Sequence, residues 1–492
     1  MVTVGSLAVA VDVYCIPSPP GEGFSGGEGP QEETFVEVRA AAADKKVALV
    51  NLGCAKNLVD AEVMLGKLYE QGYELTLDPM QADYLIVNTC GFIQSAKEES
   101  IEHILEMAEI KAQDPRKKLV VTGCLAQRYG GELRQEMPEI DALVGTGDFQ
   151  HLPQVLVQLH APIPKREYLS DNVYLYRESD ARIQTTPGHT AYIKIAEGCN
   201  HLCTFCIIPK MRGRLQSRSL ESVLAEARLL GQGGVREAIL IAQDSTEYGA
   251  DLGLRQGLAR LLTRLSEDVT TLDWLRVLYL YPSMLRPALL DVYTRQERLC
   301  KYFDMPMQHV SDRLLRAMKR GYTQRTLYRL LDDIRQRMPE ATIRSTFIVG
   351  FPGETPADVE ALLHFLEHAQ LDRVGVFTYS REEGTPSYAL SEQVPAREAA
   401  RRRREVMVLQ QEISRRKHQR LIGRQLWALV DTDPTDTQPA VGRLSSQAPE
   451  IDGVVYINGP VTSGDLVLVE ITAAEAYDFT ARVVQPARHG AA

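Results

Sequence analysis

The fold assignment starts from the stretch Ala191-Tyr-Ile-Lys-Ile-Ala-Glu-Gly-Cys199-Asn-His-Leu-Cys203-Thr-Phe-Cys206. Its first six residues are mostly apolar and predict a buried strand, which three cysteines follow in a CxxxCxxC spacing. Thiolates at such a spacing bind zinc or an iron–sulfur cluster. A structural zinc needs a fourth ligand, which His201 could supply, whereas a cluster held by three cysteines leaves one iron open to a substrate or cofactor.

The chain continues to alternate strands with helices after this stretch. The predicted strands are 191–196, 238–242, 275–280, 302–305, 342–349 and 373–379, and the predicted helices include 219–231, 314–320 and 356–369. Six such repeats predict a β/α barrel or a partial barrel, whose chemistry lies at the carboxyl-terminal mouth. Because the cysteine loop follows the first strand, it lies at that mouth, which favours catalysis over a structural role.

A second set of cysteines precedes this domain. The predicted strands are 47–52, 84–88 and 119–122, and the predicted helices are 57–71 and 95–107. This alternation indicates a parallel, doubly wound sheet. Cys54, Cys90 and Cys124 each follow one strand, and the carboxyl ends of parallel strands meet at one edge. We therefore predict one shared site; the alternative is three separate buried thiols that behave as small apolar residues.

Four further residues have simpler explanations. Asn57 and Asp60 begin the helix after Cys54, and helix capping explains them, with support of the cysteine site as an addition. Cys15 and Cys300 fall outside every motif, so a free thiol in a disordered segment and a core thiol are expected.

The two ends of the chain are acidic, whereas the predicted helix that precedes the tail is basic. Residues 1–44 are acidic and rich in Gly, Pro and Ser, which predicts a disordered leader. A predicted helix at 397–420 has a net charge of +6, whereas the tail from 421 to 488 has a net charge of −5. Short strands at 425–431, 453–457, 466–471 and 479–484 predict a small all-β barrel.

Length and composition limit the class of protein. At roughly 100–200 residues per domain, 492 residues predict about three domains. We expect the leader at 1–44, folded domains at 45–160, 189–420 and 421–492, and a linker at 161–188. The net charge of −10 argues against a protein whose whole surface binds nucleic acid. No signal peptide or transmembrane segment is predicted, so the cytoplasm, where thiols stay reduced, is the expected compartment.

The CxxxCxxC loop, placed after the first barrel strand, resembles the radical S-adenosylmethionine (SAM) superfamily. The resemblance implies that Cys199, Cys203 and Cys206 hold a 4Fe–4S cluster whose open iron binds SAM and cleaves it to a 5′-deoxyadenosyl radical. Residues at other strand ends are candidate SAM contacts: Gln243, Tyr281, Gln308, Gly350 and Gly353. The alternative for the two glycines is that they only form a turn.

A three-cysteine domain, a radical SAM domain and a β-barrel tail, in this order, resemble the methylthiotransferases. The resemblance implies a second 4Fe–4S cluster on Cys54, Cys90 and Cys124 that supplies sulfur, and a TRAM domain in the tail that recognises the substrate. It also implies two uses of SAM, first to methylate a sulfur on the second cluster and then to generate the radical. No catalytic acid or base is predicted, because the cofactors supply the reactivity.

Several stretches resemble the RimO branch, which modifies an aspartate of ribosomal protein twelve of the small subunit. They are Gly53-Cys-Ala-Lys-Asn-Leu-Val-Asp60, Asn88-Thr-Cys-Gly-Phe-Ile93, Gln243-Asp-Ser-Thr-Glu-Tyr-Gly249 and Gln308-His309. Ala61 departs from the serine that this branch often has. The acidic tail favours a basic protein as substrate, because phosphate would be repelled.

Two other functions stay open at this stage. One is modification of an adenosine in transfer RNA by the other methylthiotransferase branch. The other is a non-catalytic iron–sulfur or zinc protein that binds ribosomes. The expected partners of an enzyme are the basic ribosomal protein and an electron donor such as flavodoxin or ferredoxin. The basic helix at 397–420 either contacts ribosomal RNA or packs across the barrel with its long side chains in water.

Overall fold

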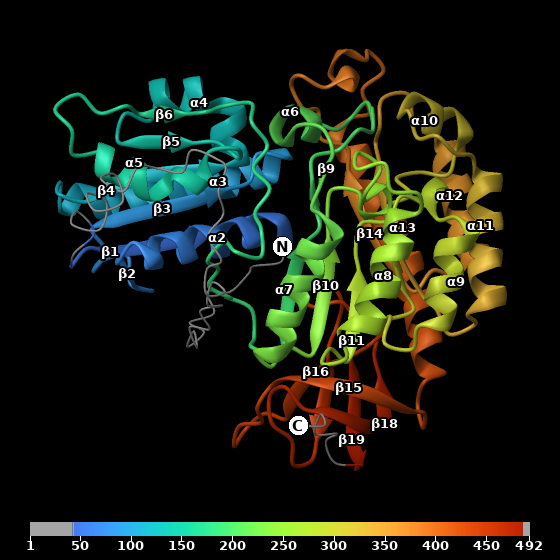
Figure 1. Cartoon of the computed structure of the whole chain (residues 1–492). Helices are drawn as coiled ribbons and strands as arrows, with labels where there is room; N and C mark the ends of the chain where they lie inside the picture. Colours follow the sequence, from blue (N-terminus) through green and yellow to red (C-terminus); the bar gives the residue numbers. More distant parts are fainter. Residues whose placement is uncertain (1–41, 43, 486–492) are drawn as a thin grey trace. The chain divides into compact units, whose positions relative to one another are not determined.

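The computed structural model describes residue 42 and residues 44–485 (Figure 1). Cys15 and nearly all of the predicted leader lie outside the described residues. By compactness the chain divides into two units. The first unit runs to Thr186 and also contains 196–200 and 207–229; the second contains 187–195, 201–206 and the chain from Leu230 onward. No helix among the described residues is long and apolar enough to cross a membrane.

A six-stranded parallel sheet organises the first unit, in the order β2-β1-β3-β4-β5-β6. Its strands are β1 (Lys46–Asn51), β2 (Glu74–Leu75), β3 (Tyr84–Thr89), β4 (Lys118–Gly123), β5 (Ala142–Val144) and β6 (Glu167–Tyr168). Its helices are α2 (Ala55–Glu70), α3 (Gln94–Gln113), α4 (Cys124–Glu136), η1 (Phe149–His151) and α5 (Leu152–Gln158). The unit also holds β8 (Ala196–Glu197), α6 (Ile208–Arg212), β9 (Gln216–Ser217) and most of α7 (Leu220–Gln232).

Both faces of this sheet are covered, which confirms the predicted doubly wound fold. Leu85, Val87 and Val121 point to one face and pack against α3 and α4. The neighbouring residues Ile86 and Val120 point to the other face and are equally buried. Strands buried on both sides read as continuous apolar runs, and this is why β3 and β4 could be predicted from sequence.

The second unit contains a β/α partial barrel followed by a small barrel (Figure 1). The strands of the partial barrel are β7 (Thr190–Lys194), β10 (Glu237–Ile241), β11 (Trp274–Val277), β12 (Tyr302–Asp304), β13 (Thr342–Val349) and β14 (Arg373–Thr378). Its helices are η2 (Ser245–Glu247), α8 (Gly257–Asp268), η3 (Pro282–Met284), α9 (Pro287–Arg295), α10 (Asp312–Ala317), α11 (Gln324–Arg337), α12 (Pro356–Ala369), η4 (Pro386–Ala389) and α13 (Ala396–Gln419).

The six predicted barrel strands are confirmed, but their hydrogen-bond ladder is interrupted. One parallel sheet has the order β11-β10-β7 and the other has the order β12-β13-β14. Between them, the strands are linked by an isolated parallel bridge from Leu275 to Leu299 and by the Leu280 amide, which donates to the Asp304 carbonyl at 2.8 Å. The Asp304 carboxylate also accepts from the Tyr279 amide at 3.0 Å, so a side chain replaces part of the ladder here.

The tail closes into the predicted barrel, in the order β15-β16-β17-β19-β18. Its strands are β15 (Gln425–Thr432), β16 (Ala440–Leu444), β17 (Val455–Asn458), β18 (Leu466–Ala474) and β19 (Phe479–Gln485). β16 was not predicted, and neither were β5 and β6, of which β6 lies in the stretch expected to be a linker. Their sequences are short, so their apolar patterns are too brief to identify.

A buried ionic network fixes the small barrel to the start of the partial-barrel strands. Arg443 of β16 donates to Glu237 at 2.6 Å and to Thr190 at 3.3 Å. Glu237 also accepts from Arg276 at 2.7 Å, and its side chain is fully buried. Since Thr190 and Glu237 are the first residues of β7 and β10, the small barrel attaches at the amino-terminal ends of these strands.

Candidate functional site

The structure places Cys54, Cys90 and Cys124 at one edge of the sheet in the first unit; we call them the N-terminal cysteine site. Cys54 is the N-cap residue of α2, Cys90 follows β3 directly, and Cys124 is the first residue of α4, directly after β4. Because β1 and β4 flank β3 in parallel register, the three residues leave the sheet side by side. Backbone packing here is tight: a Cβ on Gly53, whose φ is +96°, would lie 2.9 Å from the Cβ of Cys90.

Asn57 holds the loops of this site together, and the capping explanation for it is wrong. The N-cap of α2 is Cys54, and no side chain caps the helix. The Asn57 amide instead donates to the Leu52 carbonyl at 3.0 Å and to the Thr89 carbonyl at 2.9 Å. It therefore joins the loop before Cys54 to the strand end before Cys90, and it is 1% exposed.

The three thiols of the N-terminal cysteine site influence one another's ionisation. Burial, together with the charges of Cys124 and Cys54, raises the pKa of Cys90 to about 12. Burial also raises the pKa of Cys124, although the adjacent Arg212 opposes this. Cys54 is partly exposed. Burial of its thiol would raise the pKa, but the charges of Lys56 and Arg212 lower the pKa of Cys54 overall. Three cysteines at one edge of the sheet, beside a cation, match the donor set of a metal cluster that binds them as thiolates.

Arg212, at the end of α6, was missed by the sequence reasoning. Its Nε donates to the Sγ of Cys124 at 3.3 Å, and its Nη2 donates to the Asn57 side chain. Its Nη1 donates to Asp60 at 2.6 Å and to Glu197 at 3.2 Å. Asp60 is thus an ion-pair partner and no helix cap. The available signal was an arginine six positions after Cys206, but sequence does not reveal its burial.

The CxxxCxxC cysteines, which we call the loop site, follow β8. The boundary between the two units passes through this loop, with Cys199 in the first unit and both Cys203 and Cys206 in the second. The Cys206 amide donates to the Cys203 carbonyl at 3.1 Å, so a tight turn sets these two cysteines. The donor set of three cysteines on eight residues fits a 4Fe–4S cluster with one open iron.

A second buried arginine lies on the loop site. Arg320 donates to the Sγ of Cys203 at 3.2 Å, to the Pro306 carbonyl at 2.8 Å and to the Tyr322 hydroxyl at 2.9 Å. Its guanidinium also lies 4.1 Å from the ring centre of Tyr281. This arginine too was missed, because nothing in its local sequence relates it to a cysteine more than a hundred positions away.

His201, the candidate fourth zinc ligand, is engaged elsewhere. Its Nε2 lies 2.5 Å from the Asp244 carboxylate, and its ring stacks on Tyr281 with centroids 3.9 Å apart. Glu247 contributes a further oxygen, and one ligand atom from each of His201, Asp244 and Glu247 lies within 4.8 Å of the others. This contact of His201 with a carboxylate leaves three cysteines as the donor set of the loop.

The predicted SAM contacts all lie at carboxyl ends of partial-barrel strands. Gln243 follows β10, Tyr281 follows β11, Gln308 follows β12, and Gly350 follows β13, with Gly353 further along the same turn. Gln308 has a left-handed backbone with φ of 68°, and its backbone N–H donates to the Thr346 carbonyl at 2.8 Å. These residues remain predictions as SAM contacts.

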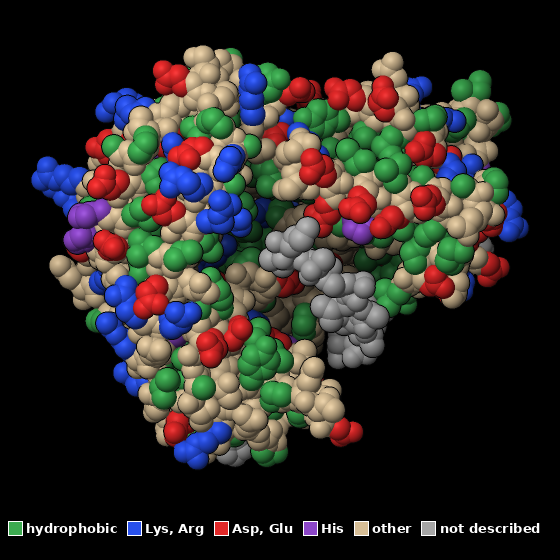
Figure 2. All heavy atoms as spheres, turned by 180° about the vertical axis from the view of Figure 1, so that it is seen from behind, with side chains coloured by type: hydrophobic (Ala, Val, Ile, Leu, Met, Phe, Trp, Pro, Cys, Tyr) green, Lys and Arg blue, Asp and Glu red, His purple; other side chains and the backbone are tan. Residues whose placement is uncertain are grey.

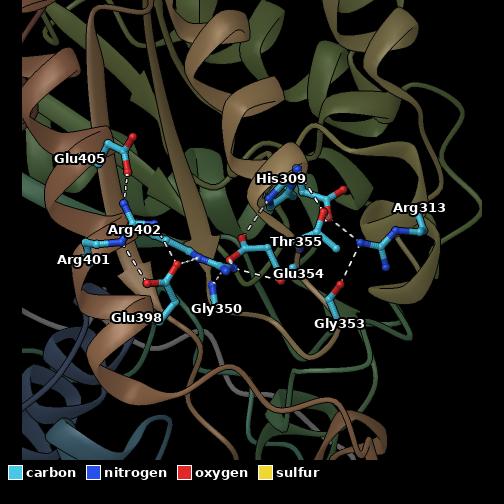
Figure 3. Close-up of polar contacts among 11 residues, drawn as sticks. His309, Arg313, Gly350, Gly353, Glu354, Thr355, Glu398, Arg401, Arg402 and Glu405 are labelled. Carbon is cyan, nitrogen blue, oxygen red and sulfur yellow. Dashed lines mark hydrogen bonds and ion pairs between the residues drawn. The ribbon is translucent and has the colours of Figure 1, made fainter.

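The turn from Gly350 to Glu354 is held by one buried carboxylate (Figure 3). Glu354 accepts from the Gly350 amide at 2.6 Å, from Arg402 of α13 at 2.6 Å and from His309 at 3.2 Å. Gly350 has φ of +79°, and a Cβ there would lie 2.6 Å from the Cβ of Ala399. The turn and the packing of α13 thus require this glycine whether or not it contacts SAM.

Three parts of the chain match known families. Residues 46–145 match an uncharacterized protein family, UPF0004, residues 193–366 match the Radical SAM superfamily, and residues 422–484 match the TRAM domain. A Trichlorobacter lovleyi protein named ribosomal protein uS12 methylthiotransferase RimO is 45% identical over 90% of this chain and 99% of its own length. The chain belongs to the RimO family. A RimO protein from Anaeromyxobacter sp. is 47% identical over 89% of this chain and 93% of its own length.

Membership in the RimO family makes the chain a radical SAM methylthiotransferase, and it confirms the branch that the sequence motifs favoured. A non-catalytic ribosome-binding protein is thereby excluded. Among solved structures, the radical SAM methyltransferase TsrM from Kitasatospora setae has a TM-score of 0.52 over 70% of this chain and 74% of its own. At 16% identity it supports the fold alone.

Proposed function

We propose that this chain adds a methylthio group to the β-carbon of an aspartate in ribosomal protein uS12, with SAM and two 4Fe–4S clusters as cofactors. The observation that carries the proposal is that the similarity to RimO relatives extends over nearly their full length. The first relative is 45% identical and is covered over 99% of its length. The two separate sets of three cysteines support it, because each set matches the donor set of one such cluster.

The two sets of cysteines have different tasks in this proposal. Cys199, Cys203 and Cys206 would hold the cluster that binds SAM, and Cys54, Cys90 and Cys124 would hold the cluster that carries the sulfur. When bound, these cofactors supply the methyl group, the sulfur and the radical that removes a β-hydrogen. Gln243, Tyr281, Gln308, Gly350 and Gly353 would contact SAM.

The protein's own contribution is placement. A β-hydrogen of aspartate is not acidic enough for a side-chain base, so no general base is needed. The buried Glu354 fixes the turn at Gly350. Tyr281 stacks on His201, which stands two positions before Cys203. Both sites therefore present fixed groups, which is what the orientation of a radical reaction requires.

The tail barrel supports a basic protein substrate, although less strongly than its net charge suggests. Asp452 is buried and accepts from Tyr302, Asp431 pairs with Arg443, and Glu470 pairs with Arg482. The acids left exposed in the described tail are Asp433, Asp436, Glu450 and Glu475. They outnumber the exposed arginines, Arg424 and Arg482, so the accessible surface still favours a basic partner.

Ribosomal RNA and an electron donor are further proposed partners. On α13, Arg402 is buried against Glu354, and Arg401 pairs with Glu398 and Glu405. Arg403, Arg404, Arg416 and Arg420 stay exposed and are the proposed phosphate contacts. Acidic and basic side chains are interspersed on the face drawn in Figure 2, which argues against a broad RNA-binding field. A flavodoxin or ferredoxin would supply electrons.

The decisive test is to incubate the reduced, reconstituted enzyme and SAM with uS12 or with transfer RNA, and to measure by mass spectrometry which one gains a methylthio group. We expect the gain on one aspartate of uS12. A gain on transfer RNA and none on uS12 would overturn the proposal. The matched control is Cys90→Ala, which should still cleave SAM but leave uS12 unmodified.

A further inference from the structure

The guanidinium of Arg212 is placed as a fixed cation inside the N-terminal cysteine site. The residue is 5% exposed, and its donors reach acceptors on three segments of the first unit: α2, the start of α4 and β8. One of these acceptors is the sulfur of Cys124, at 3.3 Å from Nε. Bonds to Asp60, Glu197 and Asn57 fix the guanidinium plane, so its Nε approaches the sulfur from a set direction.

Two buried carboxylates more than cancel the charge of this cation. Asp60 and Glu197 have side chains that are 4% and 5% exposed, and both bind the same Nη1. An arginine guanidinium is not deprotonated in proteins, even when it is buried. The guanidinium is therefore a permanent charge, and removing it would take one positive charge away from Asp60, Glu197 and the thiols.

The same contacts connect the N-terminal cysteine site to the loop site along the chain. Glu197 stands two positions before Cys199, and Arg212 stands six positions after Cys206. In the first unit, the segment that leads into the loop and the segment that leaves it therefore meet on one guanidinium, which also binds Cys124.

We propose that Arg212 is a positioning residue for the cluster on Cys54, Cys90 and Cys124: it orients the Cys124 sulfur and stabilises the reduced cluster, while Asp60 and Glu197 limit this stabilisation. The inference rests on the proposed function, which places a cluster there. Reduction adds one negative charge to a cluster, and hydrogen bonds to its sulfurs and the net charge around it set its potential. A cation on a ligand sulfur therefore favours the reduced form, and a nearby carboxylate disfavours it.

The test measures the reduction potential in a chain that holds this cluster alone. In the full-length variant with Cys199, Cys203 and Cys206 changed to Ala, anaerobic reconstitution should leave about four irons per chain. The potential is then measured by redox titration followed by electron paramagnetic resonance. Arg212→Gln should shift the equilibrium at least tenfold toward the oxidised cluster, about 59 mV for a one-electron couple. Asp60→Asn should shift it in the opposite direction.

Two further variants separate charge from geometry. Arg212→Lys keeps the charge but loses the planar fork, so the potential should change less than in Arg212→Gln while the resonance signal broadens or changes shape. Arg134→Gln removes an arginine from the same helix as Cys124, ten positions further on, about 15 Å away along the helix. Arg134 pairs with Glu167 near the surface, and its loss should change the equilibrium less than twofold.

Each outcome decides between explanations. If the iron stays bound and Arg212→Gln shifts the potential no more than Arg134→Gln, the inference is overturned while the proposed function stands. If the triple-cysteine variant binds no iron, the second cluster itself is wrong and both fail. If Arg212→Gln does not fold, the other two variants decide. A raised potential in Asp60→Asn, with a potential in Arg212→Lys close to that of the parent chain, supports the inference. A lowered or unchanged potential in Asp60→Asn contradicts it.

Discussion

The N-terminal cysteine site and the loop site each contain one buried arginine that donates a hydrogen bond to a cysteine sulfur, but the two arginines have different neighbours. Arg212 pairs with two carboxylates, Asp60 and Glu197. Arg320 contacts a carbonyl, a hydroxyl and the rings of Tyr281 and Tyr322, and none of its ion-pair or hydrogen-bond partners in the described chain is a carboxylate. Both arginines are almost fully buried.

The difference teaches how one residue type can serve two electrostatic environments. At the N-terminal cysteine site the local charge of Arg212, Asp60 and Glu197 is negative, whereas at the loop site the charge of Arg320 is cancelled by none of its direct partners. Aromatic faces stabilise a guanidinium without removing its charge, and carboxylates remove it. We therefore expect the loop site to favour added negative charge more strongly.

The largest expected effect separates the two sites by their cysteines. Cys90→Ala should lower the iron content from about eight to about four per chain and leave SAM cleavage intact. Cys206→Ala should lower the iron equally but abolish SAM cleavage. Iron assays and chromatography of 5′-deoxyadenosine measure both. An unchanged iron content in Cys90→Ala would break the comparison, because the N-terminal site would then hold no cluster.

The next effect tests the uncancelled charge. In a chain with Cys54, Cys90 and Cys124 changed to Ala, the remaining cluster should have a higher potential than the cluster that remains when Cys199, Cys203 and Cys206 are changed instead. The reason is that Arg320 leaves a positive charge beside the loop site, whereas Arg212, Asp60 and Glu197 together carry a negative charge. Redox titrations compare the two potentials; Arg320→Gln should lower the higher one, and Arg320→Lys serves as the charge-preserving control. Equal or reversed potentials would contradict the assigned charge balance.

A smaller effect concerns the hydrogen bonds by which Asn57 joins two loops of the N-terminal cysteine site. Asn57→Leu leaves the Leu52 and Thr89 carbonyls without their donor, which should reduce the free energy of unfolding by about 2–3 kcal/mol. Iron should be lost from this site and kept at the loop site. Thermal unfolding and iron assays report this. Asn458→Leu, which removes only a 3.4 Å hydrogen bond from an exposed residue to the Ala481 carbonyl of the tail barrel, is the control and should change the free energy of unfolding far less and the iron content not at all.

The smallest effect sharpens the role of the ring over Arg320. Tyr281→Phe keeps the face that lies 4.1 Å from the guanidinium and loses only a hydroxyl that accepts from Gly321 at 3.4 Å. It should change the free energy of unfolding by less than about 0.5 kcal/mol, whereas Tyr281→Leu should cost about 1–2 kcal/mol through the lost cation–π contact. Denaturant titrations measure both. Equal losses in the two variants would show that the ring face is unimportant.

Much of the fold could be predicted because the decisive signals are local. Buried parallel strands such as β3 and β4 contain continuous apolar runs, and the cysteines of the N-terminal site stand directly after strands or at the start of the next helix, where topology alone brings them to one edge. By contrast β16, with a glycine at its centre, and the two-residue strand β6 present too few apolar residues in period.

The partners of the cysteines could not be predicted, for a physical reason. Arg212 and Arg320 look like ordinary surface residues in sequence, since arginine is mostly exposed. Their burial depends on contacts with residues more than eighty positions away, such as Cys124 and Cys203. Asn57 was explained as a helix cap because asparagine favours that position, but its hydrogen bonds to two separate loops override this preference.

The attachment of the small barrel sets a minimum reach for the substrate. Arg443 binds at the first residues of β7 and β10, whereas the residues predicted to contact the cofactors follow the last residues of those strands. A five-residue strand spans about 17 Å, so a substrate gripped by the small barrel must send at least five extended residues past it to reach the reacting atoms. A compact body with one long projecting loop satisfies this requirement, and a small freely diffusing molecule does not.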